Sequence, residues 1–326
     1  MQLIALIRLI RHMLYRGLAP SISDKVGSAM HTEITIRRLI VILSVLALAV
    51  GTVILSAGRS GNDREALQVQ SAKESRAVPI IMYHSILPDP ERLGDYVVSP
   101  SQLESDMRCL KGKGFTAVSV HDLILFCEGS GDLPEKPVVL TFDDGQLNNL
   151  VYVLPLLERY DMCASFAPVG RYTEAACEEA EPSELYSYMD EDDLKKLLDS
   201  GRAELVCHSY DMHSLEGRRG LLRKPDETDK EYKRALLNDT TAAKRLFSER
   251  IGTEPEVYAY PYGFVSDTAR EVMYMLGFKA TLGTSGEVNF LSPGALTGLK
   301  EMGRFNRPSS VSSEEFISRI VSLANE

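Results

Sequence analysis

Tryptophan is absent from this chain of 326 residues, and cysteine is scarce, with five residues and no Cys-X-X-Cys pair. The cysteine count and spacing argue against a zinc ribbon and against a redox dithiol. An excess of basic charge is also lacking, because 36 Lys and Arg face 46 Asp and Glu, for a net charge of −10. Non-specific nucleic-acid binding needs a basic field, so we expect no nucleic-acid partner. With 44% hydrophobic and 25% charged residues, the composition excludes a disordered or disulfide-stapled protein.

One long hydrophobic run is present, from Leu39 to Ala57, and it contains no charged residue. As a helix it would span about 28 Å, close to the thickness of a bilayer's hydrocarbon core. Arg37 and Arg38 precede the run, so the positive-inside rule places the N-terminus in the cytoplasm and the rest of the chain outside. We therefore expect a single transmembrane anchor over residues 39–57. A cleaved signal peptide, which would make the protein secreted, is the alternative.

The segments on either side of this run carry no expected chemistry. Residues 1–38 form the expected cytoplasmic segment, which begins either with a basic amphipathic stretch or, if translation starts there, at Met30. Residues 58–77 are polar and lack apolar periodicity, which predicts a linker. Residues 78–326 then form one expected extracytoplasmic domain.

In this domain, short apolar runs alternate with amphipathic helical stretches. Val138–Phe142 is a continuous apolar and β-branched run, as expected for a strand buried in a parallel sheet. Repeated β–α units predict an α/β fold with a parallel sheet covered by helices, and the domain has about the length of one α/β barrel. The expected strands are 78–83, 115–118, 138–142, 164–167, 203–207, 256–260, 280–282 and 303–305, and the expected helices are 101–113, one from 121, 151–160, 192–198 and 230–250.

Parallel α/β folds collect their functional groups at the carboxyl ends of the strands. The polar residues near such positions are His84, Asp143, Asp144, His208, Pro261–Gly263 and Arg304.

Asp143 and Asp144 follow an apolar strand, where two adjacent carboxylates cost free energy unless something compensates them. They are either part of a helix N-cap or part of a site. His208 and His213 lie five residues apart, so on a helix their rings would point about 140° apart. On a strand end and the loop after it, both rings can converge. Two imidazoles and one carboxylate are a recognised metal triad with open coordination positions, and solvated loop histidines are the alternative.

These residues resemble the polysaccharide deacetylase family, that is, the NodB-type homology domain of carbohydrate esterase family 4. Thr141–Gly145 (TFDDG) matches the family's first motif, and Pro261–Gly263 (PYG) resembles the third. His208 with His213 matches the second motif, although the commoner spacing is four residues. The five-residue spacing and the entry Val78–Ser85 (VPIIMYHS) look like the branch that acts on poly-N-acetylglucosamine. The resemblance covers roughly residues 78–320.

The resemblance implies a distorted (β/α) barrel of about seven strands, preceded here by the single transmembrane helix. It implies that Asp144, His208 and His213 bind a divalent metal, with zinc expected and cobalt, nickel or iron also compatible with mixed nitrogen and oxygen ligands. Asp143 would then be the general base that takes a proton from the attacking water. The backbone N–H of Tyr262 would hold the oxyanion. Pro261, Tyr262 and Arg304 are the candidates for substrate binding.

The sequence departs from the family pattern in three places. Tyr258–Tyr260 stands where an Arg usually precedes the third motif, the Asp/Trp motif lacks its Trp, and the late Leu-X-His is absent. His84 follows an apolar strand and is similar to a His of the poly-N-acetylglucosamine branch, so we expect it to be the general acid, with a structural histidine as the alternative. Arg304 either replaces the missing Arg by pairing with Asp143 or forms a remote salt bridge. We expect His121 to be a capping or surface residue.

The expected protein is a membrane-anchored, metal-dependent hydrolase that removes N-acetyl groups from N-acetylglucosamine residues of an extracellular or cell-wall polysaccharide. Deacetylation of peptidoglycan or chitin oligomers is an alternative. An inactive, glycan-binding relative is another, because three family residues are missing. The sequence indicates no protein partner.

Overall fold

The computed structural model describes residues 75–325. The expected cytoplasmic segment 1–38, the expected anchor 39–57 and most of the expected linker 58–77 therefore lie outside the described residues. Within residues 75–325, no helix combines the length and the hydrophobicity needed to cross a membrane.

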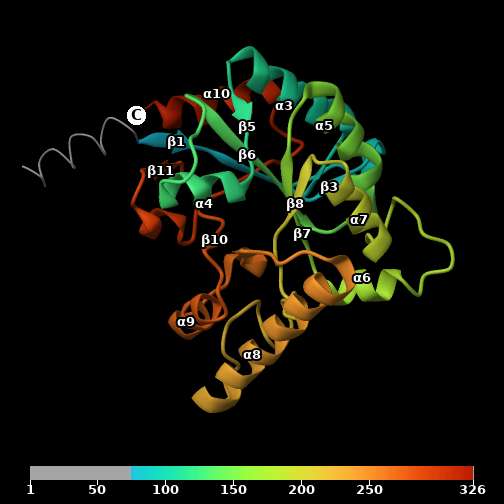
Figure 1. Cartoon of the computed structure of the whole chain (residues 1–326). Coiled ribbons are helices and arrows are strands. Elements are labelled where there is room, and N and C mark those ends of the chain that lie inside the picture. Colours follow the sequence, from blue (N-terminus) through green and yellow to red (C-terminus); the bar gives the residue numbers. More distant parts are fainter. Residues whose placement is uncertain (1–74, 326) are drawn as a thin grey trace, which may run out of the picture. The chain divides into compact units, whose positions relative to one another are not determined.

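A parallel sheet forms the centre of the described domain (Figure 1). Its main path runs β12–β2–β6–β7–β8, and each neighbouring pair is parallel. The short strand β5 (Thr116–Ala117) pairs with the start of β6. The predicted parallel α/β fold is thus confirmed. The bounds are β2 (Ile80–Tyr83), β6 (Pro137–Asp144), β7 (Ala164–Pro168), β8 (Ala203–Leu205) and β12 (Phe305–Asn306).

Two further strands, β9 (Val257–Ala259) and β10 (Ala280–Leu282), form a separate parallel pair. A bridge between Cys207 and Tyr258 joins this pair to the chain just beyond β8. A second bridge, between Leu282 and Met302, joins it to the chain just before β12. The strands therefore form a ring. The five strands of the main path make up most of it, and β9 and β10 close it through the two single bridges.

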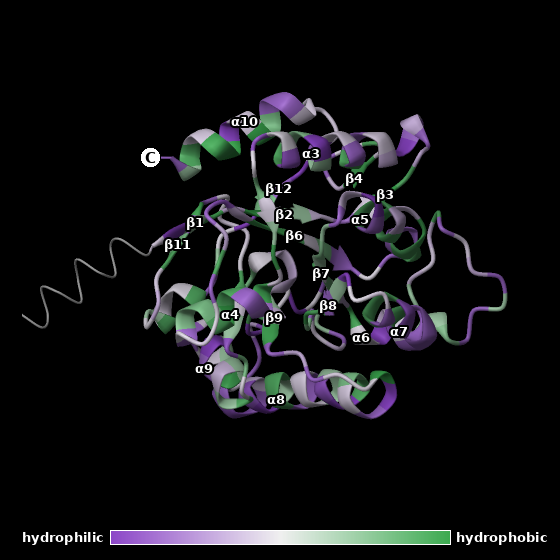
Figure 2. Cartoon of the chain, turned by 45° about the horizontal axis from the view of Figure 1, so that its top comes forward, coloured by the Kyte–Doolittle hydropathy of each residue, from purple (hydrophilic) through white to green (hydrophobic). Residues whose placement is uncertain are grey.

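Helices cover the strands. The expected helices are present as α3, α4, α5, α7 and α8, and capping boxes at Ser99, Ser119 and Thr228 define the starts of α3, α4 and α8. Helices such as α3, α8 and α10 carry both hydrophobic and hydrophilic residues (Figure 2). The bounds are α3 (Pro100–Gly112), α4 (Val120–Glu128), α5 (Leu154–Tyr160), α6 (Gly170–Ala176), α7 (Glu191–Asp199), α8 (Asp229–Arg245), α9 (Asp267–Met275) and α10 (Ser313–Ala324).

Several boundaries differ from the expected ones. The expected strand 78–83 divides at Pro79, so that β1 (Arg76–Val78) pairs antiparallel with β11 (Asn289–Leu291) while β2 enters the main sheet. Proline has no N–H to donate to a ladder, which explains the break. The expected helices 151–160 and 230–250 each include a π-helical segment. The remaining elements are β3 (Ser85–Ile86), β4 (Val97–Val98), η1 (Pro90–Arg92), η2 (Asn149–Val153), η3 (Leu246–Ile251), η4 (Pro261–Gly263) and η5 (Leu296–Leu299).

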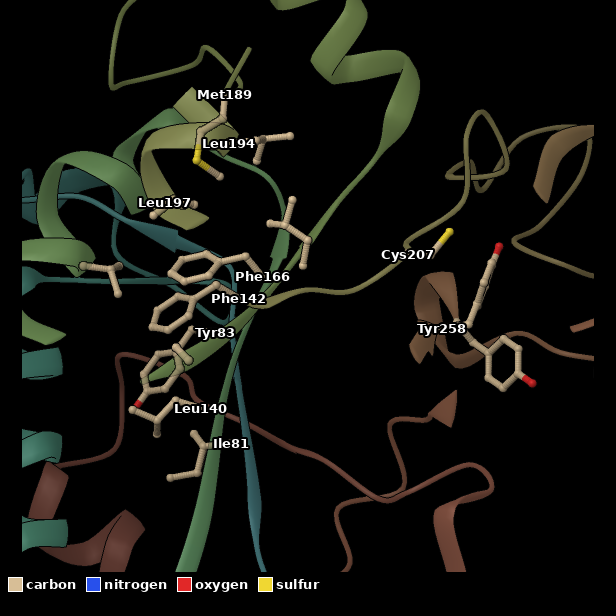
Figure 3. Close-up of a cluster of buried hydrophobic side chains, with 14 of the residues drawn as sticks. Ile81, Tyr83, Leu140, Phe142, Phe166, Met189, Leu194, Leu197, Cys207 and Tyr258 are labelled. Atoms are coloured by element: carbon tan, nitrogen blue, oxygen red, sulfur yellow. The ribbon is translucent and has the colours of Figure 1, made fainter. Parts of the chain in front are cut away.

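A row of aromatic rings fixes which residues of the central strands face the helices. Tyr83, Phe142 and Phe166 lie opposite one another on β2, β6 and β7, and their ring centroids are 5.1 Å apart in each neighbouring pair (Figure 3). All three side chains are buried. Because successive side chains of a strand point to opposite faces, Thr141 and Asp143 face the other side of the sheet, toward the inside of the ring. The pleat of β6 thus directs one carboxylate inward.

Candidate active site

The strands of the ring end at one edge, and this edge gathers the predicted site residues. Parallel strands place their carboxyl ends together. His84 follows β2, Asp143 and Asp144 end β6, His208 lies shortly beyond β8, and η4 follows β9. Arg304 is different, because it precedes β12 instead of following a strand. The next residue, Phe305, pairs with Ile81 in the middle of β2. Its long side chain reaches along the inside of the ring to the same edge.

Asp144, His208 and His213 form a compact cluster of metal-ligand type. Their ligand atoms all lie within 4.8 Å of one another. Asp144 Oδ1 is 3.0 Å from His213 Nε2 and 3.7 Å from His208 Nε2. The two imidazole centroids are 5.0 Å apart, and the His208 side chain is buried. The five-residue spacing of the histidines is therefore compatible with convergence on one point.

Hydrogen bonding defines which imidazole nitrogen faces the cluster. His208 Nδ1 lies 2.8 Å from the carbonyl oxygen of Ala259, which can only accept a hydrogen bond. Nδ1 therefore carries the proton, and Nε2 turns its lone pair toward Asp144. Burial lowers the pKa of His208 to about 4, so the ring is neutral at pH 7. A lone pair facing carboxylate oxygens at 3.7 and 3.9 Å is unfavourable unless a cation lies between them, so the donor set fits a divalent metal.

The backbone at Asp144 and Gly145 is shaped for this cluster. Asp144 has a φ of 70°, in the left-handed region that few non-glycine residues adopt. Gly145 follows with a φ of 76°, and a Cβ added there would lie 2.7 Å from Pro168 Cβ. Only glycine fits this position, so the turn after β6 requires the Gly of the TFDDG sequence.

Asp143 forms a buried ion pair with Arg304. Arg304 Nη1 donates to Asp143 Oδ1 at 2.7 Å and Nη2 donates to Oδ2 at 2.9 Å, and both side chains are at most 2% exposed. Burial alone would raise the pKa of Asp143, but the guanidinium of Arg304, together with His208, holds it well below its usual range. Arg304 Nε also donates to the Gly283 carbonyl. The carboxylate is therefore ionised and its orientation is fixed.

His84 lies at the same edge as the two aspartates. Its electrostatic interaction lowers the pKa of both Asp143 and Asp144, as expected for a basic group close to both carboxyls. The ring packs edge-on against Tyr96, with centroids 4.9 Å apart. Its Nδ1 is buried and has no hydrogen-bond partner within residues 75–325. His84 thus lies beside both carboxylates with one buried ring nitrogen unpaired among the described residues.

Tyr262 occupies the left-handed region, with a φ of 58°, in the short turn η4. Its hydroxyl lies 3.2 Å from His213 Nδ1, and its ring centroid is 4.6 Å from that of His213. The side chain is 38% exposed, whereas the neighbouring Pro261 is buried. Of the candidate substrate-binding residues, Tyr262 alone presents substantial surface, because Arg304 is also buried.

His121, which we expected to be a capping or surface residue, lies away from this cluster. His121 is half exposed and pairs with Glu256 at 3.1 Å, beside a cavity of about 430 Å³ that none of the site residues lines. This cavity lies by the opposite ends of the strands, so we place the site by its converging chemical groups. Cys207 is fully buried and packs in the hydrophobic core.

Sequence reasoning missed two residues that support the site. The Tyr172 hydroxyl, on α6, lies 3.4 Å from His213 Nδ1. Asp239, on α8, accepts backbone hydrogen bonds from Tyr210 and Asp211 in the loop between the two histidines. Tyr172 and Asp239 reach the loop only because their helices pack against it. Neither residue belongs to a recognisable sequence motif.

Comparison with known proteins agrees with these features. Residues 130–281 match a family model described as polysaccharide deacetylase. The poly-β-1,6-N-acetyl-D-glucosamine N-deacetylase of Escherichia coli strain K12 is 24% identical over 237 residues, which cover 66% of this chain and 35% of the relative. The protein of the same name from Staphylococcus aureus strain MRSA252 is 24% identical over 193 residues, which cover 58% of this chain and 61% of the relative. The chain spans about a third of the first relative's length and three fifths of the second's.

The fold also resembles solved structures. A de-N-acetylase from Aggregatibacter actinomycetemcomitans superimposes with a TM-score of 0.64 and 23% sequence identity. The superposition covers 75% of this chain and 99% of that one.

Proposed function

We propose, because this chain carries a polysaccharide deacetylase domain, that it is a hydrolase that removes N-acetyl groups from the N-acetylglucosamine residues of a polysaccharide. One observation carries the proposal: Asp144, His208 and His213 converge within 4.8 Å beside a second, ionised carboxylate. An amide is a poor electrophile, so its hydrolysis needs both a Lewis acid and a base. The names of the Escherichia coli and Staphylococcus aureus relatives make poly-β-1,6-N-acetylglucosamine the first substrate to test.

Asp144, His208 and His213 would hold the divalent cation. Zinc suits this ligand set, and cobalt, nickel and iron share its preference for nitrogen and oxygen donors. When bound, the cation supplies Lewis-acid polarisation of the amide and makes the attacking water more acidic. His208 and His213 would offer their Nε2 atoms to it, and Asp144 would supply compensating negative charge.

Asp143 acts as the general base in this proposal. The ion pair with Arg304 keeps the carboxylate ionised, so it is ready to accept the proton of the attacking water. The same ion pair makes Asp143 a weak base, which requires that the water be acidified before it is deprotonated. Arg304 itself is buried behind Asp143, so we assign it to holding the base rather than to substrate binding.

His84 and Tyr262 complete the proposed reaction. His84 donates a proton to the leaving amine, because it lies beside both carboxylates and is a histidine outside the metal-ligand set. The backbone N–H of Tyr262 donates to the oxyanion. The exposed ring of Tyr262 faces the substrate. Each role uses a different group on the same edge of the ring.

An acetate-release assay with the purified full-length protein tests the function. We expect zinc-loaded protein to release acetate from β-1,6-linked N-acetylglucosamine oligomers, with β-1,4-linked oligomers as the comparison. Chelation and Asp144→Ala should abolish release together with zinc binding, whereas Asp143→Asn should abolish release and retain zinc. Sugar binding without acetate release under zinc, cobalt or nickel would instead identify an inactive glycan-binding protein and overturn the proposal.

For the location, we propose that the domain acts outside the cytoplasmic membrane, to which residues 39–57 anchor it. The support is the uncharged apolar run and the arginines before it. We expect the chain to remain with membranes in alkaline carbonate and the domain to be cleaved by protease added to intact spheroplasts. Release of the domain into the medium would favour a cleaved signal peptide.

A further inference from the structure

The loop between the two metal-ligand histidines is held by hydrogen bonds from two helices, α6 and α8. Ser209 has a φ of 74°, which turns the chain directly after His208. From one side, α6 binds the loop, because the N–H groups of Gly170 and Arg171 donate to the carbonyls of Ser209 and Tyr210 at 3.1 and 2.8 Å. These contacts fix the carbonyls of the loop.

The approach of α6 is close. A Cβ added to Gly170 would lie 2.8 Å from Tyr210 Cδ2 and 3.3 Å from Tyr210 Cα. The absence of a side chain at this position therefore lets the first turn of the helix reach the loop backbone.

From the other side, Asp239 of α8 binds the N–H groups of the same loop. Its Oδ2 accepts from Tyr210 N at 3.0 Å, and its Oδ1 accepts from Asp211 N at 2.7 Å. The side chain is buried, and it forms no ion pair within 4.0 Å in the described part of the chain. Both oxygens of Asp239 are thus used to hold two consecutive loop amides.

We infer that Asp239 is a positioning residue for the metal site, which sets the direction in which His213 leaves the loop. The inference rests on the proposed function, since it concerns the same metal. With Asp239 in place, the loop is held through its carbonyls by α6 and through its amides by α8, and His213 Nε2 lies 3.0 Å from Asp144 Oδ1. Without it, two partly buried amides lose their acceptor, and the loop is free to rearrange so that they reach water.

Burial raises the pKa of Asp239 to about 6, although the two amide hydrogen bonds act in the opposite direction. At neutral pH the carboxylate is therefore mostly ionised and accepts from both loop amides, although burial disfavours its charge.

Metal binding by the full-length protein in detergent tests the inference. Asp239→Ala should weaken zinc binding by about 10–100-fold, the usual effect of losing a group that orients a metal ligand. Asp239→Asn should have a smaller effect, because its amide oxygen can still accept one of the two hydrogen bonds. The visible absorption of the cobalt-substituted protein should change in both variants, because it depends on ligand geometry.

Leu236→Ala is the matched control. Leu236 lies one turn earlier on α8, is fully buried and contributes to the hydrophobic core. We expect it to lower the melting temperature and to leave the zinc dissociation constant and the cobalt spectrum as in the parent protein. If Asp239→Ala and Asp239→Asn both keep the parent's zinc affinity and cobalt spectrum, the inference is overturned and the proposed function stands. If the parent protein binds no divalent cation, both are overturned.

Discussion

Arg304 donates two hydrogen bonds to Asp143, although 161 residues separate them in the chain. The family pattern places an arginine before the third motif, where this chain has Tyr258–Tyr260. Here the guanidinium comes instead from the residue preceding β12, a strand that pairs with β2, the neighbour of β6. The ion pair thus connects the last strand of the ring to the proposed catalytic base.

Arg304→Gln should lower both stability and activity. Removing one partner of a buried ion pair leaves an uncompensated charge and costs about 3–5 kcal/mol. The pKa of Asp143 should then rise, because burial remains and the guanidinium is gone, so the acidic limb of the activity profile should move to higher pH. Urea unfolding and the pH dependence of kcat/KM measure the two effects.

Arg307→Gln is the control for this change. Arg307 pairs with Asp106 at 2.8 Å in another fully buried ion pair that faces α3. The variant should lose a similar free energy of unfolding while the folded protein keeps its pH profile. If the pH profile of kcat/KM were also unchanged in Arg304→Gln, the ion pair between Arg304 and Asp143 would contribute to stability alone.

His84→Gln should separate proton transfer from metal binding. A general acid contributes about 10²–10⁴-fold to the rate, so kcat should fall by that factor while the zinc dissociation constant stays constant. His121→Gln, at a half-exposed histidine paired with Glu256, should change neither quantity. Full activity of His84→Gln would assign His84 a structural role and require another proton donor.

The two tyrosine hydroxyls beside His213 should act as alternatives to each other. The hydroxyls of Tyr172 and Tyr262 lie 3.4 and 3.2 Å from Nδ1 of His213. The double variant Tyr172→Phe/Tyr262→Phe, which lacks both hydroxyls, should raise the zinc dissociation constant about tenfold or more. Each single variant should raise it less. Tyr186→Phe, at an exposed tyrosine, is the control. Calorimetric zinc titration measures the dissociation constant of each variant and of the parent. Additive single effects would argue against shared support.

Asp239 should leave a signature in the pH dependence of stability when metal is removed by chelation. Its pKa is about 6 in the folded protein and about 3.9 in the unfolded chain. Between these values the folded state binds more protons, so this group makes the free energy of unfolding fall by about 2–3 kcal/mol as pH rises from 4 to 6. His208 acts in the opposite direction, because its pKa is lowered to about 4.

The contribution of Asp239 is therefore measured as a difference. Subtracting the unfolding free energies of Asp239→Asn from those of the parent, pH by pH, cancels His208 and the other groups. A flat difference between pH 4 and 6 would contradict the raised pKa. A difference that increases with pH would mean that the carboxylate stabilises the fold when ionised.

The sequence predicted the elements whose signals are local. The apolar run 138–142 became β6, and residues 280–282 became β10 with the same bounds. The convergence of Asp144, His208 and His213 also follows from local rules, because strand ends of a parallel sheet meet at one edge. The helices α6, α9 and α10 were missed.

The rest depends on tertiary contacts that no spacing encodes. The sequence analysis left two partners open for Arg304, since a single arginine looks the same whether it pairs with Asp143 or with a surface acid. Asp239 and Tyr172 lie on helices where each resembles an ordinary polar residue. Their roles arise only when α6 and α8 pack on either side of the loop before His213.

The late position of Arg304 in the chain has a consequence for when activity begins. A chain still emerging from the ribosome, or one clipped before β12, contains TFDDG and both histidines of the cluster but leaves Asp143 with no guanidinium to neutralise it. Such a fragment can present ligands for a cation without a correctly held base. In the proposed mechanism, a correctly held base therefore requires that the segment with Arg304 and β12 has docked onto β2.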